Sequence, residues 1–218
     1  MLKTLIQKEI LLEWRQRAAI NGILLYLIST IFVCYLSFGL KSNVINPISW
    51  NALFWIIILF TAVNSVAKSF INQTIGRQLY YYIVASPQDV IIAKVIYNTV
   101  LLISLALIGF GCYSLVMGSP VTNYALFIVD IILASIGFSI TLTMVSGIAS
   151  KANNSTTLMA ILSFPIILPM LMMVIKISKN AIDGLEWSSS ADELFTLGAI
   201  NLIVGAVTYL LFPYLWRN

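Results

Sequence analysis

Long charge-free runs alternate with short polar segments along the chain. The runs cover 18–40, 44–67, 95–117, 121–150 with Asp130 inside, 152–175 and 194–216. Each is long enough for the roughly 20 residues with which a helix crosses a bilayer. The pattern predicts six transmembrane helices at about 18–40, 46–67, 91–117, 121–148, 155–176 and 194–215, in one domain over 1–218. Gly118-Ser119-Pro120 supplies the turn between the third and the fourth.

Composition agrees with a membrane protein. Of 218 residues, 60% are hydrophobic and 9% are charged, whereas a typical soluble domain is about 25% charged. We therefore expect an all-α integral membrane protein without a soluble domain. Residues 1–17 precede the first run, which is too long for a signal-peptide core and is interpreted as an anchor.

The first 17 residues predict a helix that lies on the membrane surface. Its apolar residues share one side, with lysines and arginines largely around it. Such a pattern favours an interfacial helix on the inner leaflet. Glu9 and Glu13 fall near the apolar side, and Arg17 follows one turn later. The two carboxylates either pair with Arg17 or another helix, or are simply solvated; the sequence leaves this open.

Basic residues lie mainly on one side of this topology. With the N-terminus inside, nine of the 12 lysines and arginines fall in inner segments, and Lys41, Lys176 and Lys179 fall outside. The positive-inside rule then places both termini in the cytoplasm of a multi-pass protein of the bacterial inner membrane. Trp50 and Trp187 are expected at the outer interface. The net charge of +4 follows from this topology, so no nucleic-acid partner is expected.

The fourth predicted helix carries small and polar residues inside an apolar span. Four of them recur at every fourth position and form a ridge for close helix packing: Ser135, Ser139, Thr143 and Gly147. Asp130, in the same helix, is either a functional group or a structural hydrogen-bond partner. Cys34 and Cys112 are isolated, and we interpret both as buried and without a special role.

Two prolines stand one turn apart in the fifth predicted helix, in the stretch SFPIILP. Pro165 and Pro169 each remove a backbone donor, so the helix is expected to kink or break. Freed carbonyls need protein or water as partners in a membrane, which predicts that this face points into the bundle or a cavity. The kink is either a fixed packing feature or a hinge.

The sequence lacks the residues of several reaction types. It contains no histidine, so it cannot form a Ser-His-Asp triad or a histidine metal site, and it has no G-x-x-x-x-G-K-[ST] loop for ATP. No pair of carboxylates faces each other within the predicted spans as an acid and base would. We therefore expect a non-catalytic chain, with ATP bound and hydrolysed on a partner.

The longest predicted cytoplasmic segment, 68–94, lies between the second and third helices. It contains a turn at Ser86-Pro87 and a helix entry at Asp89. Gly76-Arg77-Gln78-Leu79, Ala85-Ser86-Pro87 and Ala93-Lys94 resemble the coupling region of ABC-2-type transporter permeases. The resemblance implies that Gly76, Arg77, Gln78, Pro87 and Lys94 belong to a surface that docks on an ATPase subunit.

Within that superfamily, the chain resembles the CcmB family, the permease subunit of the cytochrome c maturation ABC transporter. The stretches KEILLEWRQRAAI, Gly137-Phe138 with Lys151 beyond it, and LMAILSFPIILPMLMM carry the likeness. The resemblance implies a CcmA-like ATPase, a second copy in an A2B2 assembly, and CcmC- and CcmD-like membrane partners. It implies no cofactor bound by this chain, and haem as a candidate substrate.

Two other functions are compatible with the residue pattern. An ABC-2-type exporter for a lipid, a polysaccharide or a drug would share the topology and the coupling region. An integral-membrane enzyme, such as a lipid transferase, would need a polar constellation at one membrane face. Adjacent genes and the need for a separate ATPase would distinguish the three.

Overall fold

The computed structural model describes residues 2–15, 17–39, 45–66, 70, 86–150 and 155–217, and throughout these ranges the chain is helical or in turns. The helices are α1 (Leu2–Arg15), α2 (Arg17–Cys34), α3 (Pro47–Val66), α6 (Pro87–Met117), α7 (Tyr124–Ala149), α8 (Ser155–Ile182) and α9 (Ala191–Arg217). A π-helical turn, Tyr35–Gly39, extends α2, and the short 3₁₀ helix η2, Trp187–Ser190, precedes α9.

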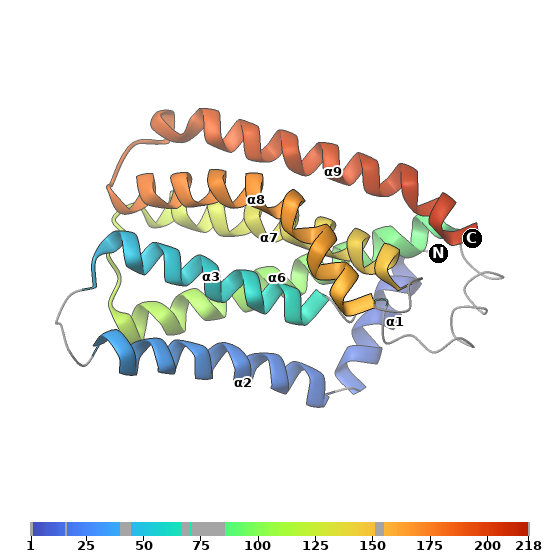
Figure 1. The fold of residues 1–218 in the computed structure, drawn as a ribbon, viewed down its shortest axis with the longest axis horizontal. Coiled ribbons are helices and arrows are strands. Elements are labelled where there is room, and N and C mark those ends of the chain that lie inside the picture. Colours follow the sequence, from blue (N-terminus) through green and yellow to red (C-terminus); the bar gives the residue numbers. More distant parts are fainter. Residues whose placement is uncertain are drawn as a thin grey trace.

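Six helices are long and apolar enough to cross a membrane, which confirms the predicted all-α membrane fold. They are α2 with its extension, α3, α6, α7, α8 and α9 with η2. They run side by side in a bundle, with both chain termini at one end (Figure 1). We call this the terminal end, and the opposite end, where α6 joins α7 and α8 joins α9, the far end.

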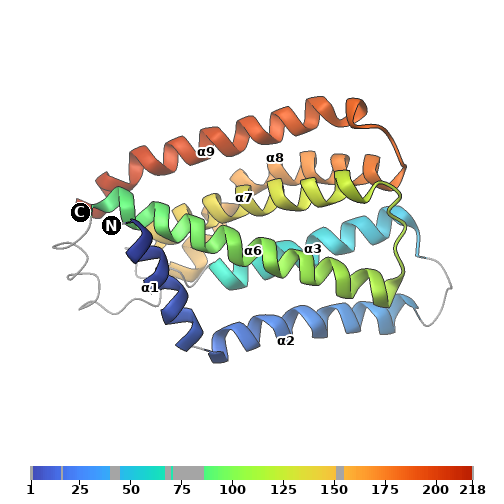
Figure 2. The ribbon, with the colours of Figure 1, turned by 180° about the vertical axis from the view of Figure 1, so that it is seen from behind.

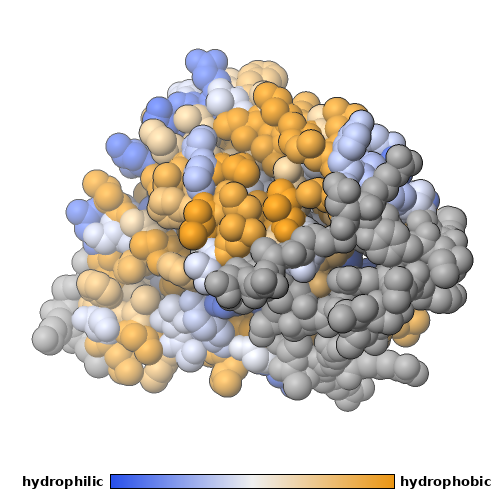
Figure 3. All heavy atoms as spheres, turned by 45° about the vertical axis from the view of Figure 1, so that its right-hand side comes forward, coloured by the Kyte–Doolittle hydropathy of each residue, from blue (hydrophilic) through white to orange (hydrophobic). Residues whose placement is uncertain are grey.

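The bundle is built around α7. This helix packs against α3, α6, α8 and α9, and 61% of its most apolar stretch is buried, compared with 17% for α2 and for the α9 span. Small side chains allow such close packing from several sides. The peripheral helices instead expose leucines, isoleucines and phenylalanines, and apolar side chains gather over much of the coloured surface in Figure 3, with polar ones among them.

Helix ends follow the local sequence. Ser86 caps α6, because its Oγ accepts a hydrogen bond from the Asp89 amide at 3.2 Å, and Pro87 occupies the first turn. This confirms the predicted turn, although α6 begins two residues before Asp89. Gly118 ends α6 with a φ of 75°, a conformation that favours glycine. The turn predicted between the third and fourth spans is therefore confirmed.

A cluster of aromatic rings joins α3, α6 and α7 at the far end. Trp50 lies 4.8 Å from Tyr113 and 6.0 Å from Phe127 between ring centroids, and Phe54 lies within 6 Å of Phe110. Trp50 Nε1 donates to the Gly118 carbonyl at 2.8 Å. Trp50 is only 1% exposed. Trp50 is therefore held inside the bundle, where its neighbours offer both stacking and a hydrogen-bond acceptor. Its level at the outer membrane interface stays a prediction.

The proline-containing helix α8 is continuous and bends near its middle (Figure 1). The predicted kink is present, but the predicted direction of the proline face is wrong. Pro165 and Pro169 are exposed on the surface of the chain, together with Phe164 and Leu168. Buried side chains such as Met170 hold the opposite face against α7. Proline rings carry no donor, so an apolar environment suits their side of the helix.

Candidate functional site: a charged junction at the terminal end

A buried ion pair connects the N-terminal helix to the bundle. Lys94, two turns into α6, is only 2% exposed, and its Nζ lies 3.5 Å from Oε2 of Glu9 on α1. The other carboxylate oxygen, Oε1, accepts a 2.8 Å hydrogen bond from Lys8. Figure 2 shows α1 crossing α6 at the terminal end. Of the alternatives left open for Glu9, the structure shows that its carboxylate pairs with another helix.

Lys94 also contacts an aromatic ring. Lys94 Nζ lies 4.6 Å from the ring centroid of Phe70, within the range of a cation–π interaction. The Phe70 ring packs on Phe212 of α9 with centroids 5.5 Å apart. Its backbone amide donates to Ser146 Oγ of α7 at 3.3 Å. The junction therefore joins α1, α6, α7 and α9 through one buried ammonium group and one ring.

Opposing effects act on the Glu9 carboxyl. Burial alone would raise its pKa, but the charge of Lys94 and the hydrogen bond and charge of Lys8 outweigh this effect. The pKa of Glu9 consequently lies below its ordinary value, and the carboxylate remains ionised. A charged pair without alternative solvation is costly to separate, so α1 is fixed to α6 at this point.

The residues of the predicted ridge on α7 face neighbouring helices. All four are buried. Thr143 Oγ1 accepts a 2.8 Å hydrogen bond from Asn98 Nδ2, and Ser139 Oγ donates to the Val95 carbonyl at 3.2 Å. A Cβ atom on Gly147 would lie 3.2 Å from the Phe212 ring. The α6–α7 contact thus extends from Ser139 and Thr143 towards the charged junction.

Asp130 is the second buried ionisable group of the described chain. Its side chain is fully buried in α7, and neither carboxylate oxygen has a hydrogen-bond partner among the residues described. It lies apart from the charged junction, nearer the far end of α7. The alternative of a satisfied structural hydrogen bond is therefore not supported within this single chain. Its role as a functional group stays a prediction.

The predicted coupling region is described only in part. Gly76, Arg77 and Gln78 lie outside the described residues. Pro87 is at the start of α6, and Lys94 is buried against Glu9. The prediction that Lys94 belongs to a docking surface is corrected, because a buried ammonium group cannot present its charge to another protein. Lys94 instead connects α6 to α1.

Several residues of the junction were not predicted from the sequence. Phe70 is one of many aromatic residues in apolar surroundings, and Asn98 has no recognisable motif around it. The pairing of Glu9 with Lys94 joins positions 85 residues apart. The only available signal was the carboxylate near the apolar side of the first helix. The side chains of Glu13 and Arg17 lie outside the described set, so their predicted pairing stays untested.

The described residues contain no group of three or more Asp, Glu, His or Cys side chains that could hold a metal ion. Six helices that are long and apolar enough to cross a membrane define the described chain as a multi-pass membrane protein. The CcmB protein family model matches residues 1–214. The chain belongs to the CcmB family, which supplies the haem exporter permease component of cytochrome c maturation. A comparison with curated proteins gave no match.

Membership of this family decides among the functions that the residue pattern allowed. The family acts in cytochrome c maturation and is associated with an ABC ATPase and other Ccm components. A permease for a polysaccharide or a drug, and a lipid-transferring enzyme, are both less compatible with a match over almost the whole chain.

Proposed function

We propose that this chain couples ATP hydrolysis on a separate CcmA-like subunit to haem delivery, or to the release of a haem-loaded chaperone. The observation that carries the coupling role is the Glu9–Lys94 pair with Phe70 beside it. Along the chain, Phe70 directly precedes the segment 71–85 and Lys94 follows it in α6, and this segment contains the candidate docking residues Gly76, Arg77 and Gln78. A displacement of that segment by the ATPase would act directly on α1, α6 and α9.

The proposed orientation puts the terminal end in the cytoplasm of a bacterium. The basic residues support it, since nine of 12 lie in segments assigned to that side. An ATPase in the cytoplasm would then meet the end that holds the charged junction. The far end, with its aromatic cluster, would face the periplasm.

The proposed assembly contains two copies of this chain, two CcmA-like ATPases, and CcmC- and CcmD-like haem-handling membrane proteins. Haem is the candidate substrate. Because the chain has no histidine, haem passing through it would not be held by the most common axial ligand. Tight haem ligation is therefore assigned to the partners.

Co-expression with the neighbouring genes tests this proposal. The tagged chain should retain an ATP-hydrolysing subunit through purification, in a complex with two copies of each. Gly76→Trp and Pro87→Ala should reduce recovery of the ATPase while membrane insertion stays normal, because both changes lie at a cytoplasmic turn. Ser119→Trp, in the exposed turn at the far end, is the matched control and should leave recovery unchanged. A stable monomer without ATPase would contradict the proposal.

A further inference from the structure

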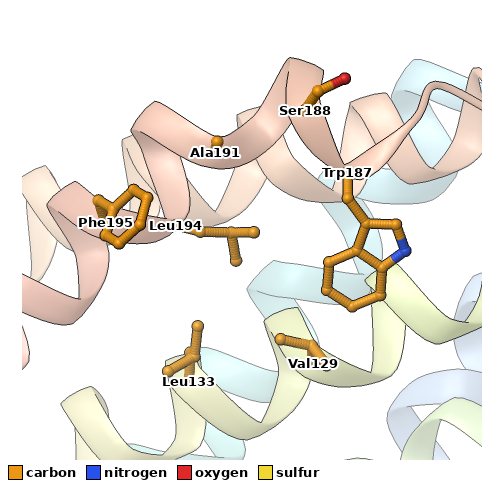
Figure 4. Close-up of a pocket in the computed structure, with 7 residues that line it drawn as sticks. All are labelled: Val129, Leu133, Trp187, Ser188, Ala191, Leu194 and Phe195. Carbon is orange, nitrogen blue, oxygen red and sulfur yellow. The ribbon is translucent and has the colours of Figure 1, made fainter.

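An apolar groove runs between α7 and α9 at the far end of the bundle (Figure 4). Its volume is about 450 Å³. Val129 and Leu133 of α7 form one wall, and Ala191, Leu194 and Phe195 of α9 form the other. The indole ring of Trp187 closes one end. This groove is separate from the charged junction, which lies at the terminal end.

The groove lies between two membrane-spanning helices and is open at the surface of the bundle. Both walls belong to membrane-spanning helices, and Phe195 and Trp187 are 79% and 46% exposed. Ser188 contributes the one hydroxyl group among the residues that line it. Water in such a site would lack the two to four polar partners it needs. The hydrocarbon chain of a neighbouring lipid can fill the same space without losing hydrogen bonds.

The charge around the mouth of the groove favours one kind of lipid headgroup. Four carboxylates lie in the connection between α8 and α9 and in the first turn of α9: Asp183, Glu186, Asp192 and Glu193. The last turns of α8 carry two lysines, Lys176 and Lys179, both exposed. The carboxylates exceed the lysines by two (four minus two). An anionic headgroup would be repelled here, and an ammonium group attracted.

Trp187 indicates the depth at which the groove lies in the membrane. Tryptophan prefers the boundary between hydrocarbon and headgroups, and no hydrogen bond within the described chain occupies its Nε1. Along the chain, Glu186 directly precedes Trp187, and Asp192 and Glu193 directly follow Ala191 of the groove wall. A lipid chain lying in the groove would therefore place its headgroup at the level of Trp187 and the acidic residues.

We propose that the groove binds one acyl chain of a zwitterionic phospholipid with an ammonium headgroup, of the phosphatidylethanolamine class. The lipid belongs to the leaflet at the far end, which is the outer leaflet in the orientation proposed above. It fills the space between α7 and α9 and stabilises their contact. The ligand binds the folded bundle alone, so its presence raises the resistance of the protein to unfolding.

Native mass spectrometry of the full chain tests the proposal. The protein is purified in mild detergent and incubated with equal amounts of phosphatidylethanolamine and phosphatidylglycerol that carry identical acyl chains. We expect one phosphatidylethanolamine to remain bound and its addition to raise Tm. Ala191→Trp fills the groove and should abolish retention. The control Ala199→Trp places the same ring on an exposed position of α9 outside the groove and should retain the lipid.

A milder pair of variants keeps the test informative if Ala191→Trp does not fold. Ala191→Leu should lower retention at least threefold relative to Ala199→Leu, with both proteins eluting as a single species. The double variant Asp192→Asn/Glu193→Gln should keep a bound chain but lose the preference for phosphatidylethanolamine over phosphatidylglycerol. Equal retention by the Ala191 and Ala199 variants, or equal binding of the two lipids to the unaltered chain, would overturn the proposal. Neither result depends on an ATPase partner.

Discussion

The two ends of the helical bundle are held together by different interactions. At the far end, α3, α6 and α7 meet through the aromatic cluster of Trp50, Phe54, Phe110, Tyr113 and Phe127. At the terminal end, helices meet through hydroxyl and amide groups and one buried ion pair. The far-end cluster contains no charged group, whereas the terminal junction depends on one.

This difference suggests that the two ends have different roles in the protein. Apolar contacts are non-directional, and a close-packed aromatic cluster has few alternative arrangements. A buried ion pair is sensitive to its partners, since the loss of one leaves the other costly to bury. We infer that the far end is a fixed pivot. We infer further that the terminal end contains the contacts that the proposed ATPase partner would rearrange.

The largest expected effect is at the aromatic cluster. Trp50→Ala removes a buried ring and its hydrogen bond to Gly118, and should lower the free energy of unfolding by about 3–5 kcal/mol. The control Phe60→Ala removes an exposed ring of the same helix, α3, and should cost under about 1 kcal/mol. Denaturant titration of the purified chain in detergent micelles measures both. Equal losses of unfolding free energy in the two variants would show that the cluster is not the main stabilising contact of the far end.

The second prediction concerns the charged junction. Glu9→Gln leaves the Lys94 ammonium buried without its carboxylate, and should lower the free energy of unfolding by about 3 kcal/mol. Lys94→Met should cost less, because Glu9 keeps its hydrogen bond to Lys8. The double variant should be more stable than Glu9→Gln alone, because no buried charge is left unpaired. Additive losses in this double-mutant cycle would show that the two residues do not interact.

The third prediction concerns the two prolines of α8. Pro165→Ala/Pro169→Ala restores two amide donors, and a proline can cost about 3 kcal/mol in an unaccommodated helix interior. Both rings are exposed, so their removal leaves core packing intact. We expect normal abundance in the membrane and loss of cytochrome c maturation, because a straight α8 changes the position of its terminal-end half. Full activity at normal abundance would show that the prolines are not required and that the hinge hypothesis is wrong.

The smallest expected effect is the pH dependence of the junction. The pKa of Glu9 is lower in the folded chain than its ordinary value of 4.5. The folded state thus binds fewer protons than the unfolded state at acidic pH. The stability that Glu9 contributes is therefore complete above about pH 4.5, and it is lost as the pH falls through the lower pKa of Glu9 in the folded chain. Glu9→Gln should remove this acid-sensitive contribution to the stability. A pH series of unfolding midpoints, compared between the two proteins, would reveal it as a difference that narrows below pH 4.5.

The sequence was sufficient for the spans and for the local features that end them. Charge-free runs, the Gly118 turn and the start of α6 near Ser86-Pro87 depend on neighbouring residues, and all three are present close to where they were predicted. The burial of Trp50 inside the bundle was not predicted, and the direction of the α8 proline face was predicted wrongly. Both depend on which face of a helix meets its neighbours, and an almost uniformly apolar helix gives no such signal. The Glu9–Lys94 pair depends on the crossing of two helices distant in the chain.

Distance measurements between spin labels on the two ends test the central claim most directly. After replacement of Cys34 and Cys112, one labelled pair joins exposed Leu11 on α1 to Tyr214 on α9 at the terminal end, and another joins exposed Ser49 to Glu186 at the far end. The distances are recorded in the ATPase complex before and after ATP with vanadate. We predict that the terminal pair shifts and the far pair keeps its distribution. A shift confined to the far pair would contradict the account.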